Sequence, residues 1–370
     1  MSTARELILH IGHYKTGTTA LQVFLERNRA LLAGQGLMYA QAPVKFSKHS
    51  ALAFSLLRDA GVTALMHDFR NRHSAAELWQ ELFAATRALP EGTSMLVSSE
   101  EFIRLGAHPA AAALLRAQID TARDLRFRVI AYLRPPQEHL RSWYNQLVKM
   151  GVPVGGFDAA VRAQMEAVHW DYALALKPWI ALFGPEAIVL RSFEPDLRDG
   201  DALFEDFLAA LGHGLPMAAS TTPGDPNPRM DDRVLGIRRA LTRAGLPKDL
   251  AGQVMARAKA SFDAETAADA LSDAPDFDTI RQRADAGIAA LAALPGAGDL
   301  NAALLRAALP APQDAGERQL EQAVVALSSE LAQMRSAQLR QAARLNALEK
   351  RLDDADQAKT QTTGPSGGKP

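Results

Sequence analysis

Short apolar runs alternate with longer segments of helical periodicity over residues 5–222. The runs expected to form strands are 7–11, 36–39, 94–99, 127–133 and 187–193. Between them apolar residues recur every three or four positions, and the first such helix is expected over 18–33. Strands that alternate with helices are typical of a mostly parallel sheet with helices on both faces. The pattern therefore predicts a three-layer α/β fold for this part of the chain.

The pattern changes near residue 223. A turn-rich segment, 222–228, contains three prolines, and residues 229–309 are rich in alanine and arginine with helical periodicity but no convincing strand. A second linker with prolines follows at 309–316. We therefore divide the chain into an α/β domain (1–222), a helical extension (223–312), a coiled coil (313–356) and a polar tail (357–370) that is expected to be disordered.

The segment before the tail carries a heptad repeat. Its seam positions alternate in spacings of four and three: Leu320, Val324, Leu327, Leu331, Met334, Gln338, Gln341, Leu345, Leu348 and Leu352. In a parallel partner, Glu330 would face Arg335 and Arg344 would face Glu349, so both flanking pairs are opposite in charge. A single amphipathic helix that folds back on the domain is the alternative. We favour a homodimer or small homo-oligomer formed through residues 317–356.

Composition narrows the possible classes of function. The 370 residues are 48% hydrophobic and carry a net charge of −1, which provides no overall basic field for nucleic acid or an anionic membrane. No cysteine is present, which excludes disulfides, thiolate metal sites and cysteine nucleophiles. The N-terminus shows no secretory core, and no apolar run approaches the ~20 residues that span a bilayer. We expect a soluble cytoplasmic protein.

The first expected strand ends in a phosphate-binding type of loop. Its residues are Gly12, His13, Tyr14, Lys15, Thr16, Gly17, Thr18 and Thr19. The glycines allow amide N–H groups to converge on one anion, and the following helix directs its positive end to the same point. In nucleoside triphosphatases the lysine follows the last glycine directly and precedes a magnesium-binding hydroxyl. Here Lys15 comes two residues before Gly17. The loop is therefore expected to hold an anion without a metal ion.

A second anion site is expected where the 127–133 strand ends. Pro135 and Pro136 mark the change from strand to helix, because proline cannot donate a hydrogen bond and suits the first helical turn. Arg134 thus stands at the end of the strand, where its guanidinium can bind a phosphate through two bonds. Ser142 lies about two helical turns further on, within reach of the same anion.

These two segments resemble the sulfotransferases that use 3′-phosphoadenosine 5′-phosphosulfate (PAPS). Residues 10–22 read His-Ile-Gly-His-Tyr-Lys-Thr-Gly-Thr-Thr-Ala-Leu-Gln, close to that family's first motif, and Arg134, Ser142 and Tyr144 match its 3′-phosphate motif. The resemblance covers roughly residues 5–215 and implies a P-loop-like fold. It also implies that Lys15, Thr16, Gly17, Thr18 and Thr19 bind the 5′-phosphosulfate, whereas Arg134 and Ser142 hold the 3′-phosphate that remains in the product, PAP.

Transfer of a sulfuryl group to an alcohol needs a base for the hydroxyl proton and a donor for the leaving phosphate oxygen. Lys15 suits the second role. In the family, members that act on sugars or tyrosine commonly use a glutamate at the sheet's ligand edge, and by that likeness Glu100 is our candidate base. Alternatively, Glu100 and Glu101 only begin the next helix favourably for its dipole. No further Cys or His cluster is expected to join His10 and His13, so we expect no metal.

The sequence thus favours transfer of a sulfuryl group from PAPS to a hydroxyl of a carbohydrate, glycolipid or metabolite. A P-loop kinase that requires magnesium and a non-catalytic oligomerising scaffold are the alternatives. Residues 41–75 and 223–310 are the expected walls of the acceptor cleft, and they contain no motif that selects an acceptor.

Overall fold

The computed structural model describes residues 5–41, 46–63, 65, 69, 72–152, 154, 156–222, 235–264, 277–312 and 331–351. The chain divides into two compact units. Unit 1 comprises Met1–Leu147, Gly155–Arg229 and Ser272–Gln313, and unit 2 comprises Val148–Val154, Met230–Leu271 and Asp314–Pro370. None of the helices in these ranges has both the length and the apolar composition needed to cross a bilayer.

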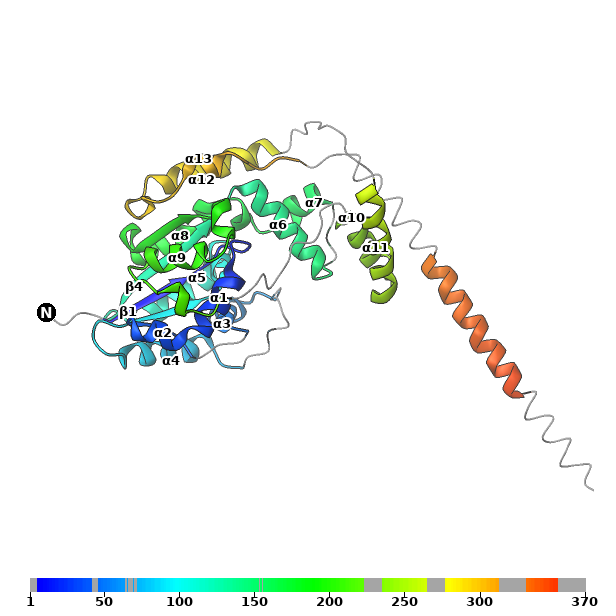
Figure 1. Cartoon of the computed structure of the whole chain (residues 1–370), viewed down its shortest axis with the longest axis horizontal. Coiled ribbons are helices and arrows are strands. Elements are labelled where there is room, and N and C mark those ends of the chain that lie inside the picture. Colours follow the sequence, from blue (N-terminus) through cyan, green and yellow to red (C-terminus); the bar gives the residue numbers. More distant parts are fainter. Residues whose placement is uncertain are drawn as a thin grey trace, which may run out of the picture. The chain divides into compact units, whose positions relative to one another are not determined.

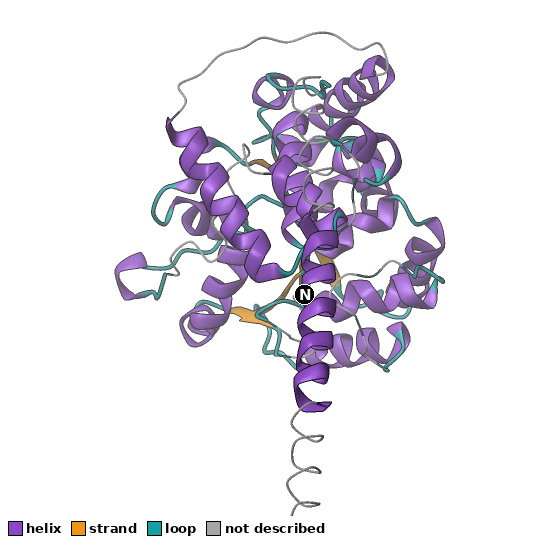
Figure 2. Cartoon of the chain, turned by 90° about the vertical axis from the view of Figure 1, so that its right-hand side faces the viewer, coloured by secondary structure: helices purple, strands orange, loops and turns teal. Residues whose placement is uncertain are grey.

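The centre of unit 1 is a parallel sheet of five strands in the order β2-β3-β1-β4-β5. The strands are β1 (Glu6–His10), β2 (Leu37–Tyr39), β3 (Ser94–Ser98), β4 (Arg126–Leu133) and β5 (Ile188–Ser192). Each of the five expected strands is confirmed to within one residue at either end. Figure 2 shows the described strands lying among helices, as expected for a sheet covered on both faces.

In unit 1, helices lie between successive strands along the chain, and further helices follow the last strand, β5 (Figure 1). They are α1 (Thr18–Arg27), α2 (Arg29–Gly34), α3 (Ser50–Asp59), α4 (Ala75–Arg87), α5 (Pro109–Ile119), α6 (Pro136–Lys149), α7 (Phe157–Ala163), α8 (Tyr172–Phe183), α9 (Ala202–Ala210), α12 (Asp278–Ala292) and α13 (Ala302–Arg306). The last two residues of α6 fall in unit 2. Short 3-10 helices are η2 (Glu100–Gly106), η3 (Ala167–His169), η4 (Pro185–Ala187), η5 (Pro195–Arg198), η6 (Met217–Ala219) and η9 (Pro295–Ala297).

Alternation along the strands builds one core on each face of the sheet. Ile8 and Ile130 point to one face and pack with α1, α2 and α9, where the rings of Phe24 and Phe204 stack 4.3 Å apart. On the other face Phe127 lies between the rings of Phe83 on α4 and Phe183 on α8. The three-layer α/β architecture predicted from the sequence is therefore confirmed.

The first helix is shorter than expected. The sequence pattern predicts one helix over 18–33, whereas the chain forms α1 and α2 with a break at Asn28. The Asn28 side chain donates to the carbonyl of Phe24 and accepts from the amide of Thr221, with bonds of 2.8 and 2.9 Å. A side-chain amide that bonds nearby backbone groups competes with the helical ladder, which explains the interruption.

Helices α12 and α13 belong to unit 1. Arg283 on α12 donates to Asp171, which caps α8, at 2.5 Å. Asn301 at the start of α13 donates its backbone N–H to Ser192 at the end of β5, at 2.8 Å. Gly296 lies so close to β5 that a Cβ there would be 1.8 Å from the Ile188 carbonyl oxygen. This segment therefore packs directly against the sheet domain.

Unit 2 contains a helical hairpin and a longer helix. The hairpin is α10 (Leu235–Arg243) and α11 (Lys248–Ala264), which enclose a small apolar cluster around Ile237, Leu241 and Leu246. Residues 331–351 are helical. Four of the expected seam residues, Leu320, Val324, Leu327 and Leu352, and the whole expected tail lie outside the described residues.

Candidate functional site

The carboxyl ends of β3, β1 and β4 place the predicted site residues side by side. All strands are parallel and β1 lies between β3 and β4, so the loops after these strands emerge at one edge of the sheet. The Lys15 loop follows β1, Glu100 comes two residues after β3, and Arg134 follows β4 directly. In open parallel sheets this edge is where ligands bind. The loop thus has Glu100 on one side and Arg134 on the other.

The loop is held by its own backbone and by β4. The pairing with β4 continues beyond the end of β1. The amide of His13 donates to the carbonyl of Tyr132 at 3.0 Å, and the amide of Tyr132 donates to the carbonyl of Gly12 at 2.8 Å. Thr16 closes the turn by donating its hydroxyl to the His13 carbonyl at 2.7 Å. A Cβ on Gly12 would be 3.1 Å from the Cα of Glu100. Glycine at this position therefore lets the loop lie against the candidate base.

The start of α1 offers backbone donors to an anion. Gly17 is its N-cap, with φ of 76°, and it supplies no capping side chain. No acidic residue lies in the first turn, where the first amides of a helix have no intrahelical acceptor. Lys15 also adopts a positive φ, 64°, a conformation that is costly for a residue with a Cβ and is concentrated at functional sites. These features fit the anion-binding role expected for residues 15–19.

Arg134 and the Lys15 loop are in direct contact. Nη1 of Arg134 donates to the Lys15 carbonyl at 3.2 Å, and Nζ of Lys15 donates to Oε1 of Gln146 at 3.2 Å. Gln146 lies on α6, one turn after Ser142, which is nearly buried. The two anion motifs, far apart in the sequence, therefore meet at one place.

The contacts of Arg134 suit a further anionic partner. Its Nη2 donates to Glu138 at 2.6 Å, but Arg198 shares that carboxylate at 3.3 Å. Nε of Arg134 is buried and has no hydrogen-bond partner among the described residues. Burial lowers the pKa of Arg134, a shift that its bond to Glu138 opposes. A buried guanidinium with an unsatisfied donor is costly, and a bound phosphate would relieve that cost.

Glu100 is held at both carboxylate oxygens. Oε1 accepts from Nζ of Lys48 at 3.0 Å and Oε2 accepts from Nε2 of Gln22 at 2.8 Å. Burial acts to raise the pKa of Glu100, but the Lys48 charge and the Gln22 bond outweigh it, so the pKa is lowered. Glu100 is therefore a carboxylate at neutral pH, the form that can accept a proton. Nothing in the sequence pointed to Lys48.

Glu101 is more completely enclosed than Glu100. It is fully buried and accepts from Lys48 at 2.7 Å, Ser50 at 3.0 Å and Ser99 at 2.6 Å. Glu100 and Glu101 begin the short helix η2, as the alternative interpretation expected. Glu100 lies directly against the phosphate loop, since a Cβ on Gly12 would be 3.1 Å from its Cα and 3.2 Å from its Cβ.

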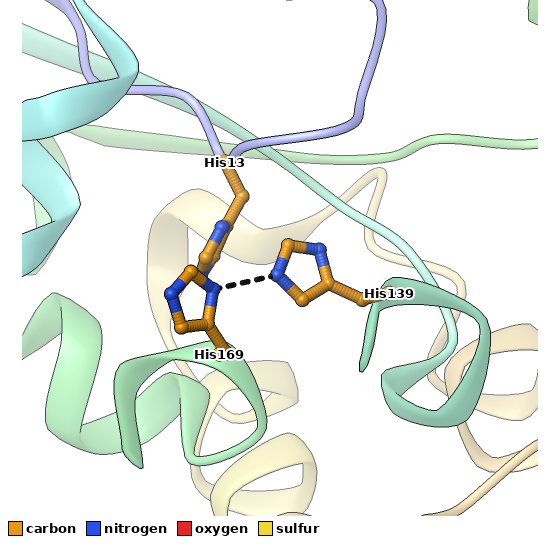
Figure 3. A group of neighbouring side chains, drawn as sticks. All are labelled: His13, His139 and His169. Carbon is orange, nitrogen blue, oxygen red and sulfur yellow. Dashed lines mark hydrogen bonds between the residues drawn. The ribbon is translucent and has the colours of Figure 1, made fainter. Parts of the chain in front are cut away.

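The structure brings together a histidine group that the sequence analysis did not expect. His13, His139 and His169 are buried, and one nitrogen from each lies within 4.8 Å of the others (Figure 3). The group is already hydrogen-bonded: His13 Nε2 donates to the Val168 carbonyl and its Nδ1 accepts from the Tyr14 amide, both at 2.8 Å. His139 Nε2 and His169 Nδ1 are 3.0 Å apart. His13 Nε2 carries the proton that it donates, and the lone pair of Nδ1 accepts the Tyr14 amide. His13 therefore has no free lone pair, and in this arrangement the three histidines cannot all bind one metal ion.

These histidines are separated by 126 and 30 positions in the sequence, so no local ligand spacing marked them. Burial lowers the pKa of His13 to about 4 and those of His139 and His169 well below their ordinary value. The group is therefore neutral at physiological pH and packs beneath the loop. These contacts indicate that His13 positions the loop.

Comparisons with known proteins give little further information. No protein-family model matches the chain, and no curated protein matches it. Among solved structures it is similar to a sulfotransferase from Alicyclobacillus acidocaldarius, with 18% sequence identity and a TM-score of 0.37, over 64% of this chain and 90% of that one. A likeness this weak carries no argument about activity or substrate.

Proposed function

We propose that the protein is a sulfotransferase that moves a sulfuryl group from PAPS to a hydroxyl of a carbohydrate, glycolipid or other metabolite. The observation that carries the proposal is the contact between Arg134 and the Lys15 loop, beside Glu100. It supports one continuous site with cations for both phosphate ends of an adenylate and a carboxylate next to the point of transfer.

Each group has a role that its position supports. The amides at the start of α1, with Thr16, Thr18 and Thr19 nearby, bind the 5′-phosphosulfate, while Arg134 and Ser142 bind the 3′-phosphate. In the transfer, a bond forms between the acceptor oxygen and sulfur as the bond from sulfur to the 5′-phosphate oxygen breaks. Lys15 stabilises the negative charge that develops on that leaving oxygen.

Glu100 receives the acceptor's proton. A carboxylate with a lowered pKa is a weak base, but the hydroxyl becomes strongly acidic as its oxygen bonds to sulfur, so transfer is favourable late in the reaction. Lys48 keeps its second bond, to Glu101, when Glu100 is neutralised. Protonation of Glu100 thus removes one of the two negative charges beside Lys48, and the lysine remains paired with Glu101.

Ligand binding separates this function from the alternatives. In a thermal denaturation assay, PAP should raise the Tm of the protein even when EDTA is present, because a ligand that binds only the folded state stabilises it. Stabilisation by ATP only with magnesium would instead support a kinase, and stabilisation by neither would support a scaffold.

Variants connect this binding to named residues. Arg134→Gln should abolish the shift produced by PAP. Arg141→Gln, which removes an exposed cation from the nearby helix α6, should leave the shift unchanged. With ³⁵S-labelled PAPS and fractionated cell extracts, Glu100→Gln should retain the PAP shift but lose labelled product. Full transfer by Glu100→Gln would remove Glu100 from its role.

A further inference from the structure

The helix at residues 331–351, orange in Figure 1, carries an exposed apolar stripe. Leu331, Met334, Leu345 and Leu348 are 54, 60, 59 and 47% exposed. They occupy successive seam positions of the heptad repeat, and Gln338 and Gln341 fill the two positions between them. All four apolar residues therefore lie along one line of the helix.

The described residues of unit 2 leave this stripe uncovered. Ala332 packs against the apolar cluster of Ile237, Leu241 and Leu246, near the start of the helix. Beyond it, residues 333–351 are exposed except Ala337, which is half-buried. Most helices in proteins owe their stability to the packing of an apolar face. The stripe needs a partner helix.

The charges beside the stripe indicate which partner fits. When the heptad frame is continued along the sequence, the positions that face each other across a parallel pair are Glu330 with Arg335, Arg344 with Glu349, and Arg351 with Asp356. All three pairs are opposite in charge, and in a homodimer each occurs twice. A second copy of this chain therefore satisfies the flanking charges.

The glutamines set the alignment of that pair. Gln338 and Gln341 are the only polar seam positions in the described helix. In a parallel dimer without offset, each glutamine lies opposite the same glutamine of the partner, and the two side-chain amides can hydrogen-bond to each other. A shift by one heptad would instead place each glutamine opposite a leucine or methionine. We propose that two copies of the chain associate through a parallel, in-register, two-stranded coiled coil that includes residues 331–351. The proposal is independent of the proposed catalytic function.

Sedimentation equilibrium of the full chain tests the association. The wild type should sediment as a dimer. Leu345→Arg should raise the dimer dissociation constant at least tenfold, because it buries an arginine in the seam. Leu339→Arg is the matched control: Leu339 is 62% exposed but lies off the stripe, so this variant should remain dimeric. A monomeric wild type, a higher oligomer, or equal effects of the two variants would overturn the proposal.

Engineered cysteines test the direction of the helices, since the natural chain contains no cysteine to interfere. In the parallel arrangement, the cysteine of the Leu348→Cys variant should form a disulfide with the same cysteine of the second chain under mild oxidation. In an antiparallel pair, position 348 would face position 331, ~25 Å along the helix from its own copy. A mixture of Leu331→Cys and Leu348→Cys chains would then cross-link as the mixed species, and that result would refute the parallel arrangement.

Discussion

Lowering the pH from 8 to 5 should destabilise this protein strongly through three buried histidines. His10, His13 and His49 are almost completely buried, and burial lowers the pKa of each from 6.5 to about 4. Opposing contributions are smaller: the charge of Glu100 acts to raise the pKa of His10, and backbone hydrogen bonds act to raise the pKa values of His13 and His49. Each ring is therefore neutral in the folded protein at pH 5.

The sign and size follow from the difference between the folded and unfolded chain. Between pH 6.5 and 4 the unfolded chain binds protons that the folded protein rejects, so stability falls as the pH falls. At pH 5 each histidine lowers the free energy of unfolding by ~2 kcal/mol relative to pH 8. These three groups lower it by roughly 6 kcal/mol, which is comparable to the whole stability of many domains. His139 and His169, whose pKa values burial also lowers, add to the loss in the same direction.

Urea unfolding followed by tryptophan fluorescence at pH 8, 7, 6 and 5 measures this loss. Carboxylates contribute little in this window, because groups such as Glu166, with a pKa of about 2, take up protons at lower pH. His49→Asn supplies an amide in place of the ring and should reduce the loss by about 2 kcal/mol. His73→Asn removes an exposed histidine and should leave it unchanged.

A free energy of unfolding that stays constant between pH 8 and 5 would refute the reasoning. So would a loss of the same size in wild type and His49→Asn, because the histidines would then not be the groups that bind the protons.

Three further changes test other parts of the structure. Lys48→Met should raise the pKa of Glu100, because the ammonium holds that pKa down, so the acid limb of the pH–rate profile should move to higher pH; an unmoved limb would contradict this. Gly296→Ala should lower the free energy of unfolding by ~3 kcal/mol or more, since the added Cβ meets the β5 backbone, whereas Gly298→Ala, which meets nothing within 4 Å, should be tolerated in the same denaturation assay. Glu166→Gln should cost ~2–3 kcal/mol at pH 7, and the difference from wild type, measured by urea unfolding, should shrink as the pH falls from 4.5 toward the folded pKa of about 2.

The fold was predictable because its signals are local. Five short apolar runs separated by helical periodicity indicated a parallel sheet, and Pro136 indicated the start of α6. The break at Asn28 was missed, since it depends on a bond to Thr221, which lies 193 positions away. The residue type hinted at competition with the helix, but its partner could come only from the structure.

The candidate site was predictable where one segment carries its own chemistry. The Lys15 loop and Arg134 were found from motifs, and parallel strand ends explain why they meet. Lys48 and the group of His13, His139 and His169 were missed for the opposite reason. Their neighbours come from segments between 30 and 155 positions apart, and no spacing along one helix or strand records such contacts.

Because β1 lies between β3 and β4, the proposed catalytic residues on its two sides come from two different segments of the chain. Lys48 and Glu100 belong to the stretch that builds β2 and β3, whereas Arg134, Ser142 and Gln146 belong to β4 and α6. The half that would meet the acceptor can therefore diverge while the half that would hold the nucleotide stays intact. Replacement of residues 37–106 is the corresponding engineering route to a new acceptor for the proposed reaction.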